Sequence, residues 1–338
     1  MLHRKCLLVI AATVGGAVSS AATSSALASD RDICGSRQPT AEVGAACARI
    51  IAAPETSNHD RALATAFRGE AERGQGDVNG ALTDYNQALA TLPENIIALN
   101  GRAIINRNRK QYDLALTDLD KAISIEPGNA ELYNTRGITY RQKGDPRRAI
   151  EDFNQAIKLA PKYPLAFNNR GNAYSDLKDA AHAIVDFNQA VAQDPNYASA
   201  YYNRALVWSN IKADYDKAIA DYTQAIKLNP KYEDALVNRG IAFAQQHKMQ
   251  AALADLNAAI GLDPGDVLAY DNRGILFLKT GDNARAIADF DVVLKAEPQN
   301  AKMLFARGTA KRKLGDKAAG DADIAAAKAI NPDVEKQL

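Results

Sequence analysis

Apolar and polar residues alternate along most of the chain with the period of a helix, in pairs of short stretches separated by breaks. Residues 130–163 show the pattern most clearly. The first stretch carries its packing residues on one face: Tyr133, Gly137 and Tyr140. After a break at residues 143–146, the second stretch does the same with Ala149, Phe153, Ala156 and Ile157. Pro161 then ends the second stretch, so the pattern predicts a helical hairpin.

This hairpin occurs eight times in succession. A proline ends each copy, at intervals of 34 residues with one interval of 35: Pro93, Pro127, Pro161, Pro195, Pro230, Pro264, Pro298 and Pro332. A small residue returns in the same register of each first helix and lets two helix axes approach closely: Gly69, Ala103, Gly137, Gly171, Ala205, Gly240, Gly274 and Gly308. Because one hairpin cannot bury its apolar faces alone, neighbouring hairpins must stack. The extra residue of the longer copy falls in a turn at residues 211–215, where a loop can accept it.

At the spacing of Tyr133, Gly137, Tyr140, Ala149, Phe153 and Pro161, the sequence resembles the tetratricopeptide repeat family. The resemblance implies an all-α fold, a right-handed α-solenoid of about eight helical hairpins. We expect the repeats at residues 62–95, 96–129, 130–163, 164–197, 198–232, 233–266, 267–300 and 301–334, followed by a tail at residues 335–338. The chain departs from the family at one position, where arginine replaces the usual leucine.

The N-terminal segment has the layout of a secretory signal peptide over residues 1–28, with a basic start, a short apolar middle and small residues before the cleavage point. We therefore expect an exported protein of the bacterial periplasm; an uncleaved N-terminal membrane anchor is the alternative. Residues 29–61 form a leader with a predicted capping helix at residues 40–53. Cleavage leaves two cysteines, Cys34 and Cys47, which an exported protein is expected to join in a disulfide, with two free buried thiols as the alternative.

Charge and composition argue against several classes of function. The chain carries 41 basic and 40 acidic side chains, so no overall field would attract nucleic acid or an anionic membrane. The histidines show no metal-ligand spacing, and the glycines serve packing and turns rather than a phosphate-binding loop. We expect no enzymatic activity, no cofactor, no nucleic-acid partner and no stable membrane insertion after signal cleavage.

An arginine and an aspartate recur in all eight repeats, 16 residues apart in seven repeats and 17 in the longer one. Arg136 stands eight residues before Gly144, and Asp152 eight residues after it. Residues equidistant from the turn of an antiparallel hairpin lie side by side, so we predict partly buried ion pairs that set hairpin register, among them Arg136 with Asp152 and Arg170 with Asp186. The alternative is that these arginines bind a ligand.

An asparagine precedes this arginine in four successive repeats, off the packing face: Asn169, Asn203, Asn238 and Asn272. Three residues further along the same surface come Asn172, Leu206, Ile241 and Ile275. The family resemblance implies that first helices line a concave surface, where such an asparagine bonds the backbone of an extended peptide with its amide donor and acceptor. We predict a peptide-binding groove here. The alternative is a solvated helix face whose apolar residues only support neighbouring repeats.

Basic residues are sparse on this face in the central repeats, which argues against the family's clamp for a terminal carboxylate. A basic cluster near the N-terminal end would either receive an acidic partner or form a solvated face: Arg107, Arg109, Lys110 and Arg141. The predicted function is a non-enzymatic scaffold or adaptor that binds a protein or extended peptide in the concave groove. One alternative is a structural component of a cell-envelope assembly that uses the convex face or the solenoid ends. Another is polysaccharide or nucleic-acid recognition, for which a basic track with aromatic platforms is lacking.

Overall fold

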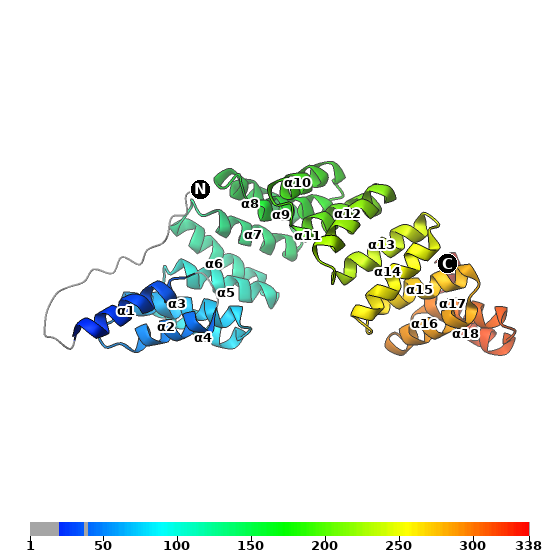
Figure 1. Ribbon diagram of the computed structural model, residues 1–338, viewed down its shortest axis with the longest axis horizontal. Helices are drawn as coiled ribbons and strands as arrows, with labels where there is room; N and C mark the ends of the chain where they lie inside the picture. Colours follow the sequence, from blue (N-terminus) through cyan, green and yellow to red (C-terminus); the bar gives the residue numbers. More distant parts are fainter. Residues whose placement is uncertain (1–19, 37–39, 338) are drawn as a thin grey trace. The chain divides into compact units, whose positions relative to one another are not determined.

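The computed structural model of the protein describes residues 20–36 and 40–337 (Figure 1). Every regular element in this part of the chain is a helix, as the sequence predicts. Residues 1–19 of the predicted signal peptide lie outside the described residues, and its last residues belong to α1 (Ser20–Cys34). Across the described ranges, no helix combines the length and the apolar character needed to span a bilayer.

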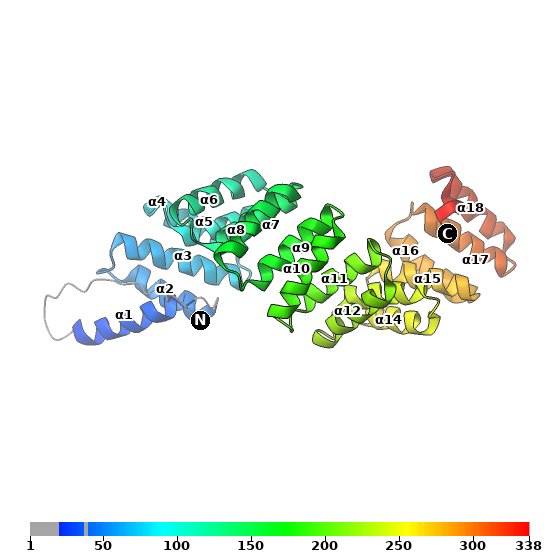
Figure 2. The ribbon, with the colours of Figure 1, turned by 90° about the horizontal axis from the view of Figure 1, so that it is seen from above.

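The chain divides into two compact units, Met1–Leu177 and Lys178–Leu338. The described part of the first unit contains α1 (Ser20–Cys34), α2 (Ala41–Ala52), α3 (Asn58–Gly74), α4 (Val78–Thr91), α5 (Ile96–Asn108), α6 (Tyr112–Ile125), α7 (Ala130–Lys143), α8 (Pro146–Leu159) and α9 (Pro164–Asp176). The second contains α10 (Ala180–Gln193), α11 (Ala198–Asn210), α12 (Tyr215–Leu228), α13 (Glu233–Gln245), α14 (Met249–Leu262), α15 (Val267–Thr280), α16 (Asn283–Ala296), α17 (Ala301–Lys313), α18 (Lys317–Ile330) and the 3-10 helix η1 (Val334–Gln337). Within each unit, successive helices run back and forth beside one another (Figures 1 and 2).

Each unit has two layers of helices. Within a unit, each helix packs against the helix before it and the helix after it. First helices also contact the first helix of the next repeat, as α3 does with α5, α5 with α7, and α13 with α15. Among the described residues, no second helix makes a comparable contact with the next second helix. The first helices therefore form an inner layer in each unit, and the second helices form an outer layer.

Short-range chemistry builds the turn inside each hairpin. An aspartate side chain accepts a hydrogen bond from the backbone N–H three residues later at the start of most second helices: Asp77, Asp145, Asp179, Asp214, Asp282 and Asp316. The turn also needs one residue with positive φ, which is Gly76, Gly144, Gly281 or Gly315 in four repeats and Lys110, Lys178, Ala213 or His247 in the others. The extra residue of the longer repeat lies between the end of α11 at Asn210 and the start of α12 at Tyr215, as predicted.

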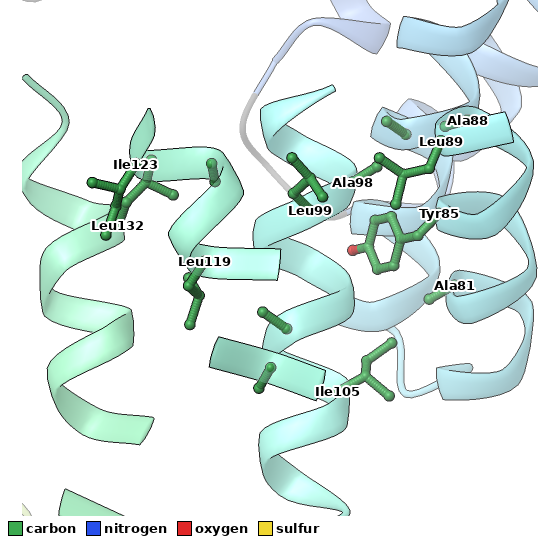
Figure 3. Close-up of a cluster of buried hydrophobic side chains, with 14 residues drawn as sticks. Ala81, Tyr85, Ala88, Leu89, Ala98, Leu99, Ile105, Leu119, Ile123 and Leu132 are labelled. Atoms are coloured by element: carbon green, nitrogen blue, oxygen red, sulfur yellow. The ribbon is translucent and has the colours of Figure 1, made fainter. Parts of the chain in front are cut away.

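Large side chains from the second helices fill the space beside the small residues of the first helices. Tyr85, Leu99, Leu119 and Leu132 lie in one buried cluster that joins α4, α5, α6 and α7 (Figure 3). The fit is close in both units. A Cβ atom added to Gly137 would lie 2.6 Å from Cε1 of Phe153, and one added to Gly274 would lie 2.6 Å from Cε1 of Phe290. At Gly137 and Gly274 a ring therefore occupies the space that a larger side chain would need, and at Gly240 and Gly308 the aliphatic side chains of Leu256 and Ile324 lie in the same place.

The N-terminal leader forms two helices where the sequence predicted one. The helix α2 occupies the predicted position, and α1 packs against it. The helix α1 could not be predicted from the sequence, because its many alanine and serine residues show no apolar stripe. The two helices are joined by a disulfide between Cys34 and Cys47, with an S–S distance of 2.13 Å. Arg49 Nε also donates to Asp30 Oδ2 across them at 2.9 Å.

Candidate functional site

The recurring arginine and aspartate form a two-point ion pair inside the hairpins. Arg136 Nε donates to Asp152 Oδ2 at 2.9 Å, and Arg136 Nη2 donates to Asp152 Oδ1 at 2.7 Å. The same fork joins six further pairs: Arg68–Asp84, Arg102–Asp118, Arg204–Asp221, Arg239–Asp255, Arg273–Asp289 and Arg307–Asp323. Arg170 lies in the first unit and Asp186 in the second, so that pair stays a prediction.

The third nitrogen of the same guanidinium reaches the preceding repeat, a contact that the sequence analysis did not predict. Arg136 Nη1 donates to Asp120 Oδ1, and Arg273 Nη1 donates to Asn257 Oδ1, both at 2.7 Å. The acceptor stands two residues after the aspartate in seven repeats: Asn86, Asp120, Asn154, Asn188, Thr223, Asn257 and Asp291. The eighth repeat has Ala325 at this position. The arginine thus links the second helices of two successive repeats.

Aromatic rings and charge complete the surroundings of these arginines. The guanidinium carbon of Arg136 lies 5.6 Å from the ring centroid of Tyr133, and that of Arg273 lies 5.2 Å from the ring centroid of Tyr270. The hydrogen bonds to Asp152 raise the pKa of Arg136 above its ordinary value. Since Nε, Nη1 and Nη2 all bond residues of the hairpins, Arg136 and Arg273 belong to the framework of the fold rather than to a ligand site.

The asparagines of the second unit lie on its inner layer. Asn238 on α13 and Asn272 on α15 are both partly exposed. Each Nδ2 donates to the backbone carbonyl four residues earlier at 2.8 Å, Asp234 O for Asn238 and Leu268 O for Asn272. Asn238 Nδ2 also donates to the hydroxyl of Tyr202 on α11 at 3.3 Å. These bonds fix the plane of each amide. No donor in the described part of the chain reaches either Oδ1, so both oxygens are oriented acceptors.

Three predicted apolar residues accompany these amides on the inner layer. Leu206 on α11, Ile241 on α13 and Ile275 on α15 are partly buried and pack against the hydrophobic clusters of their own repeats. Each retains an exposed part. The side chains therefore support neighbouring helices, and the exposed remainder adds apolar surface beside the amides.

The corresponding asparagines of the other repeats have different surroundings. Asn169 Nδ2 on α9 donates to Oδ1 of Asn134 on α7 at 2.9 Å, and Asn134 is buried. This bond ties two first helices of the first unit together. Asn172, three residues further along α9, and Asn203 on α11 are partly exposed.

Acidic groups gather near the starts of α13 and α15. Burial and a hydrogen bond with Asp266 raise the pKa of Glu233 to about 7, and the charges of Asp234 and Asp263 add to the rise. Asp266 itself caps α15 by accepting from the backbone N–H groups of residues 268 and 269. Glu233 therefore changes its charge near neutral pH. The described residues include no group of three or more histidine, cysteine, aspartate or glutamate side chains placed to hold a metal ion.

Comparison with protein families identifies the repeat. A profile of the tetratricopeptide repeat matches residues 68–130, 212–267 and 272–334. Other profiles of this repeat match residues 119–151, 137–178 and 164–197. No curated protein matches the sequence.

Several solved structures share the fold. PilW, a widely conserved type IV pilus biogenesis factor, is 22% identical, with 62% of this chain and 97% of PilW covered and a TM-score of 0.56. PilF of Pseudomonas aeruginosa is 19% identical, with 63% and 97% covered and a TM-score of 0.55. A tetratricopeptide repeat protein of Parabacteroides merdae is 22% identical, with 71% and 96% covered and a TM-score of 0.53. At these identities the likeness is one of fold alone.

Proposed function

The chain belongs to the tetratricopeptide repeat family, and from this premise we propose that it is a non-enzymatic scaffold that binds an extended segment of a partner protein along its first helices. Proteins of this family bind protein or peptide partners. The observation that carries the proposal is the pair of oriented amide oxygens, Asn238 Oδ1 and Asn272 Oδ1, on adjacent helices of one layer.

The spacing of the layer suits an extended chain. Packed helices lie about 8–10 Å apart, and an extended chain rises about 3.3 Å per residue. Roughly every third residue of a bound segment would therefore reach the next asparagine along the layer. There a backbone N–H of the segment would donate to Oδ1, while Leu206, Ile241 and Ile275 contact its apolar side chains.

We propose an exported location, the bacterial periplasm, for this activity. The signal-peptide pattern of residues 1–28 supports this location. The disulfide between Cys34 and Cys47 supports it independently, because disulfides persist in oxidising compartments.

Peptide binding by a double variant, Asn238→Ala with Asn272→Ala, tests the proposal. Linear peptides selected against the wild-type protein from a displayed library are labelled and titrated by fluorescence anisotropy. We expect the affinity to fall by about tenfold, ~1.4 kcal/mol, because two backbone donors of the peptide lose their acceptors.

The matched control replaces two exposed glutamines of the outer layer, Gln189→Ala with Gln250→Ala, and should keep the wild-type affinity. Circular dichroism establishes that both variants are folded. A folded asparagine variant with unchanged affinity would contradict the proposal and favour assembly through the outer layer or the ends of the chain.

A further inference from the structure

Three arginines occupy the same position in successive first helices of the first unit: Arg73 on α3, Arg107 on α5 and Arg141 on α7. Because α3 contacts α5 and α5 contacts α7, these arginines form a row across the inner layer. The equivalent position holds Ser209, Ala244 and Leu278 in three successive first helices of the second unit, and Arg312 in its last first helix. The arginine row is therefore a local feature and not part of the repeated framework.

The two outer arginines of the row have carboxylate partners. Arg73 Nη2 donates to Glu70 Oε2 at 2.6 Å, and Arg141 Nε donates to Asp176 Oδ2 at 2.6 Å. Glu70 is held in turn by the hydroxyl of Tyr85, which donates to its Oε1 at 2.5 Å. These two arginines are neutralised by residues of the same layer.

The middle arginine, Arg107, has no carboxylate partner within the described residues. Its Nη2 donates to Asn108 Oδ1 at 3.3 Å, and its Nε is buried without an acceptor in that part of the chain. Burial lowers the pKa of Arg107, and the charge of Arg73 lowers it further. A partly buried cation beside a like charge and without a counter-charge is unfavourable. The remaining donors of its guanidinium, on Nη1 and Nη2, suit an anion.

The rest of the predicted basic cluster does not share this property. Arg109 Nη2 donates to Asn79 Oδ1 at 3.0 Å and is exposed, and Lys110 is an exposed residue in the turn after α5. Together with the pairing of Arg141, this leaves Arg107 as the one member of the cluster that combines burial with a missing counter-charge in the described chain.

We propose that Arg107 anchors an acidic side chain of an extended segment bound along the first helices of the first unit, and that the carboxylate accepts two hydrogen bonds from Nη1 and Nη2 of the guanidinium. The inference rests on the proposed binding of an extended segment by the first helices, and it adds the chemistry of that segment. Glu70 and Asp176, which flank the row, would repel further carboxylates and restrict the site to one acidic residue.

A titration with a single amino acid tests the anion site without any peptide. N-acetyl-glutamate N-methylamide is added to the ¹⁵N-labelled protein, and the Nε–Hε signals of arginine are followed by NMR. We expect a saturable shift of the Arg107 signal, no shift of the Arg109 signal, and no shift with the glutamine analogue. A stationary Arg107 signal, or equal shifts of all arginine signals, would overturn the proposal.

Selected peptides with amidated C-termini test the site in its functional setting. Replacing the glutamate of such a peptide by glutamine, or its aspartate by asparagine, should weaken binding to the wild-type protein about tenfold. The same replacement should have little effect on binding to the Arg107→Gln variant. The control Arg109→Gln should behave as the wild type. Arg107→Gln should be at least as stable as the wild type in urea, because it removes an uncompensated charge; clear destabilisation would contradict that premise.

The outcomes separate this inference from the proposed function. If Asn238→Ala with Asn272→Ala weakens binding while Arg107→Gln does not, the proposed function stands and the acidic anchor is wrong. If no linear peptide binds, the proposed function is wrong, and the assignment of Arg107 to an acidic residue of a bound segment is wrong too. This holds even if the NMR titration shows that Arg107 binds a free carboxylate. If only peptides with a free C-terminus respond to Arg107→Gln, the ligand is a terminal carboxylate and the side-chain assignment is overturned.

Discussion

The two units are built on the same framework and differ on the surface of their first helices. Arg136 and Asp152 in the first unit make the same fork as Arg273 and Asp289 in the second, with Nε···Oδ2 distances of 2.9 Å in both. The inner layers then diverge. The first unit carries the arginine row around Arg107, whereas the second has oriented amides and the acidic groups around Glu233. Residues that recur in both units hold the fold, and residues that differ between them are the candidates for selecting a ligand.

The asparagine column shows that a shared residue type does not guarantee a shared role. Asn169 bonds a neighbouring helix through Asn134, Asn238 bonds both Tyr202 of the neighbouring helix and a carbonyl of its own helix, and Asn272 bonds a carbonyl of its own helix. At the position of Asn134, the first helix that precedes Asn238 carries Tyr202 and the first helix that precedes Asn272 carries Val237, so the neighbour available to each amide changes. The partner that fixes each amide therefore differs from repeat to repeat.

The framework arginines should give the largest effect, and the same effect in both units. Arg136→Ala and Arg273→Ala should each lower the free energy of unfolding by about 3 kcal/mol, because each leaves a buried aspartate without its counter-charge. Urea denaturation followed by circular dichroism measures the loss, with the exposed Arg147→Ala as control.

A double-mutant cycle isolates the pair itself. Arg273→Ala with Asp289→Ala should show a coupling free energy on the order of 1 kcal/mol or more, and a value near zero would contradict the role in register. The same cycle applied to Arg170 and Asp186 tests the pair that remains a prediction.

Substitutions at the contact between a glycine and an aromatic ring should give the next largest loss of stability. Gly137→Ala and Gly274→Ala should each destabilise by about 1–3 kcal/mol, because the added Cβ would overlap the rings of Phe153 and Phe290. Gly261→Ala in α14 is the matched control, since nothing lies within 4 Å of its added Cβ, and it should stabilise the helix. Similar thermal denaturation midpoints for all three variants would show that the small-residue column is not set by packing.

The second unit should have a pH dependence of its own. The folded-state pKa of Glu233, about 7, lies above the value of about 4.3 in an unfolded chain, so the folded state binds more protons between these values. Stability from this group is complete below about pH 4.3 and falls as the pH rises towards 7, by about 1 kcal/mol after allowance for solvent exposure. Glu233→Gln should remove this decline, as measured by urea denaturation at several pH values. If the stability of Glu233→Gln declined with pH as steeply as that of the wild type, other titratable groups would be responsible for the decline.

The turns should give the smallest effect. Lys110 and Ala213 adopt positive φ values of 61° and 52°, which strain any residue with a Cβ atom. Lys110→Gly and Ala213→Gly should raise the free energy of unfolding by about 0.5 kcal/mol, since the relief of strain exceeds the entropy cost of glycine. Gly144→Ala should act in the opposite direction, and thermal denaturation resolves the difference. If Gly144→Ala changed the free energy of unfolding in the same direction as Lys110→Gly and Ala213→Gly, strain at positive φ would not explain the residue types in the turns.

The sequence predicted the helices and the repeat well because eight copies turn a weak preference at each position into a clear pattern. The acceptor two residues after each aspartate was visible in the same way, from Asn86 to Asp291. Its role was missed because it depends on the stacking of one repeat on the next. The state of Arg107 could not be predicted either. Arg107 lacks a carboxylate partner because Glu70 pairs with Arg73 and Asp176 pairs with Arg141. Sequence spacing alone does not show which of the three arginines each carboxylate will bond.

The most direct test asks whether the arginines that hold the repeats together are separate from the residues that bind a ligand. Side-chain NMR signals of the protein are recorded with and without a saturating amount of a selected peptide. The account predicts that the Nδ2 signals of Asn238 and Asn272 shift on binding, while the Nε signals of Arg239 and Arg273 keep their positions. Shifts of the arginine signals with stationary asparagine signals would contradict it, because the ligand would then contact the residues that hold the repeats together.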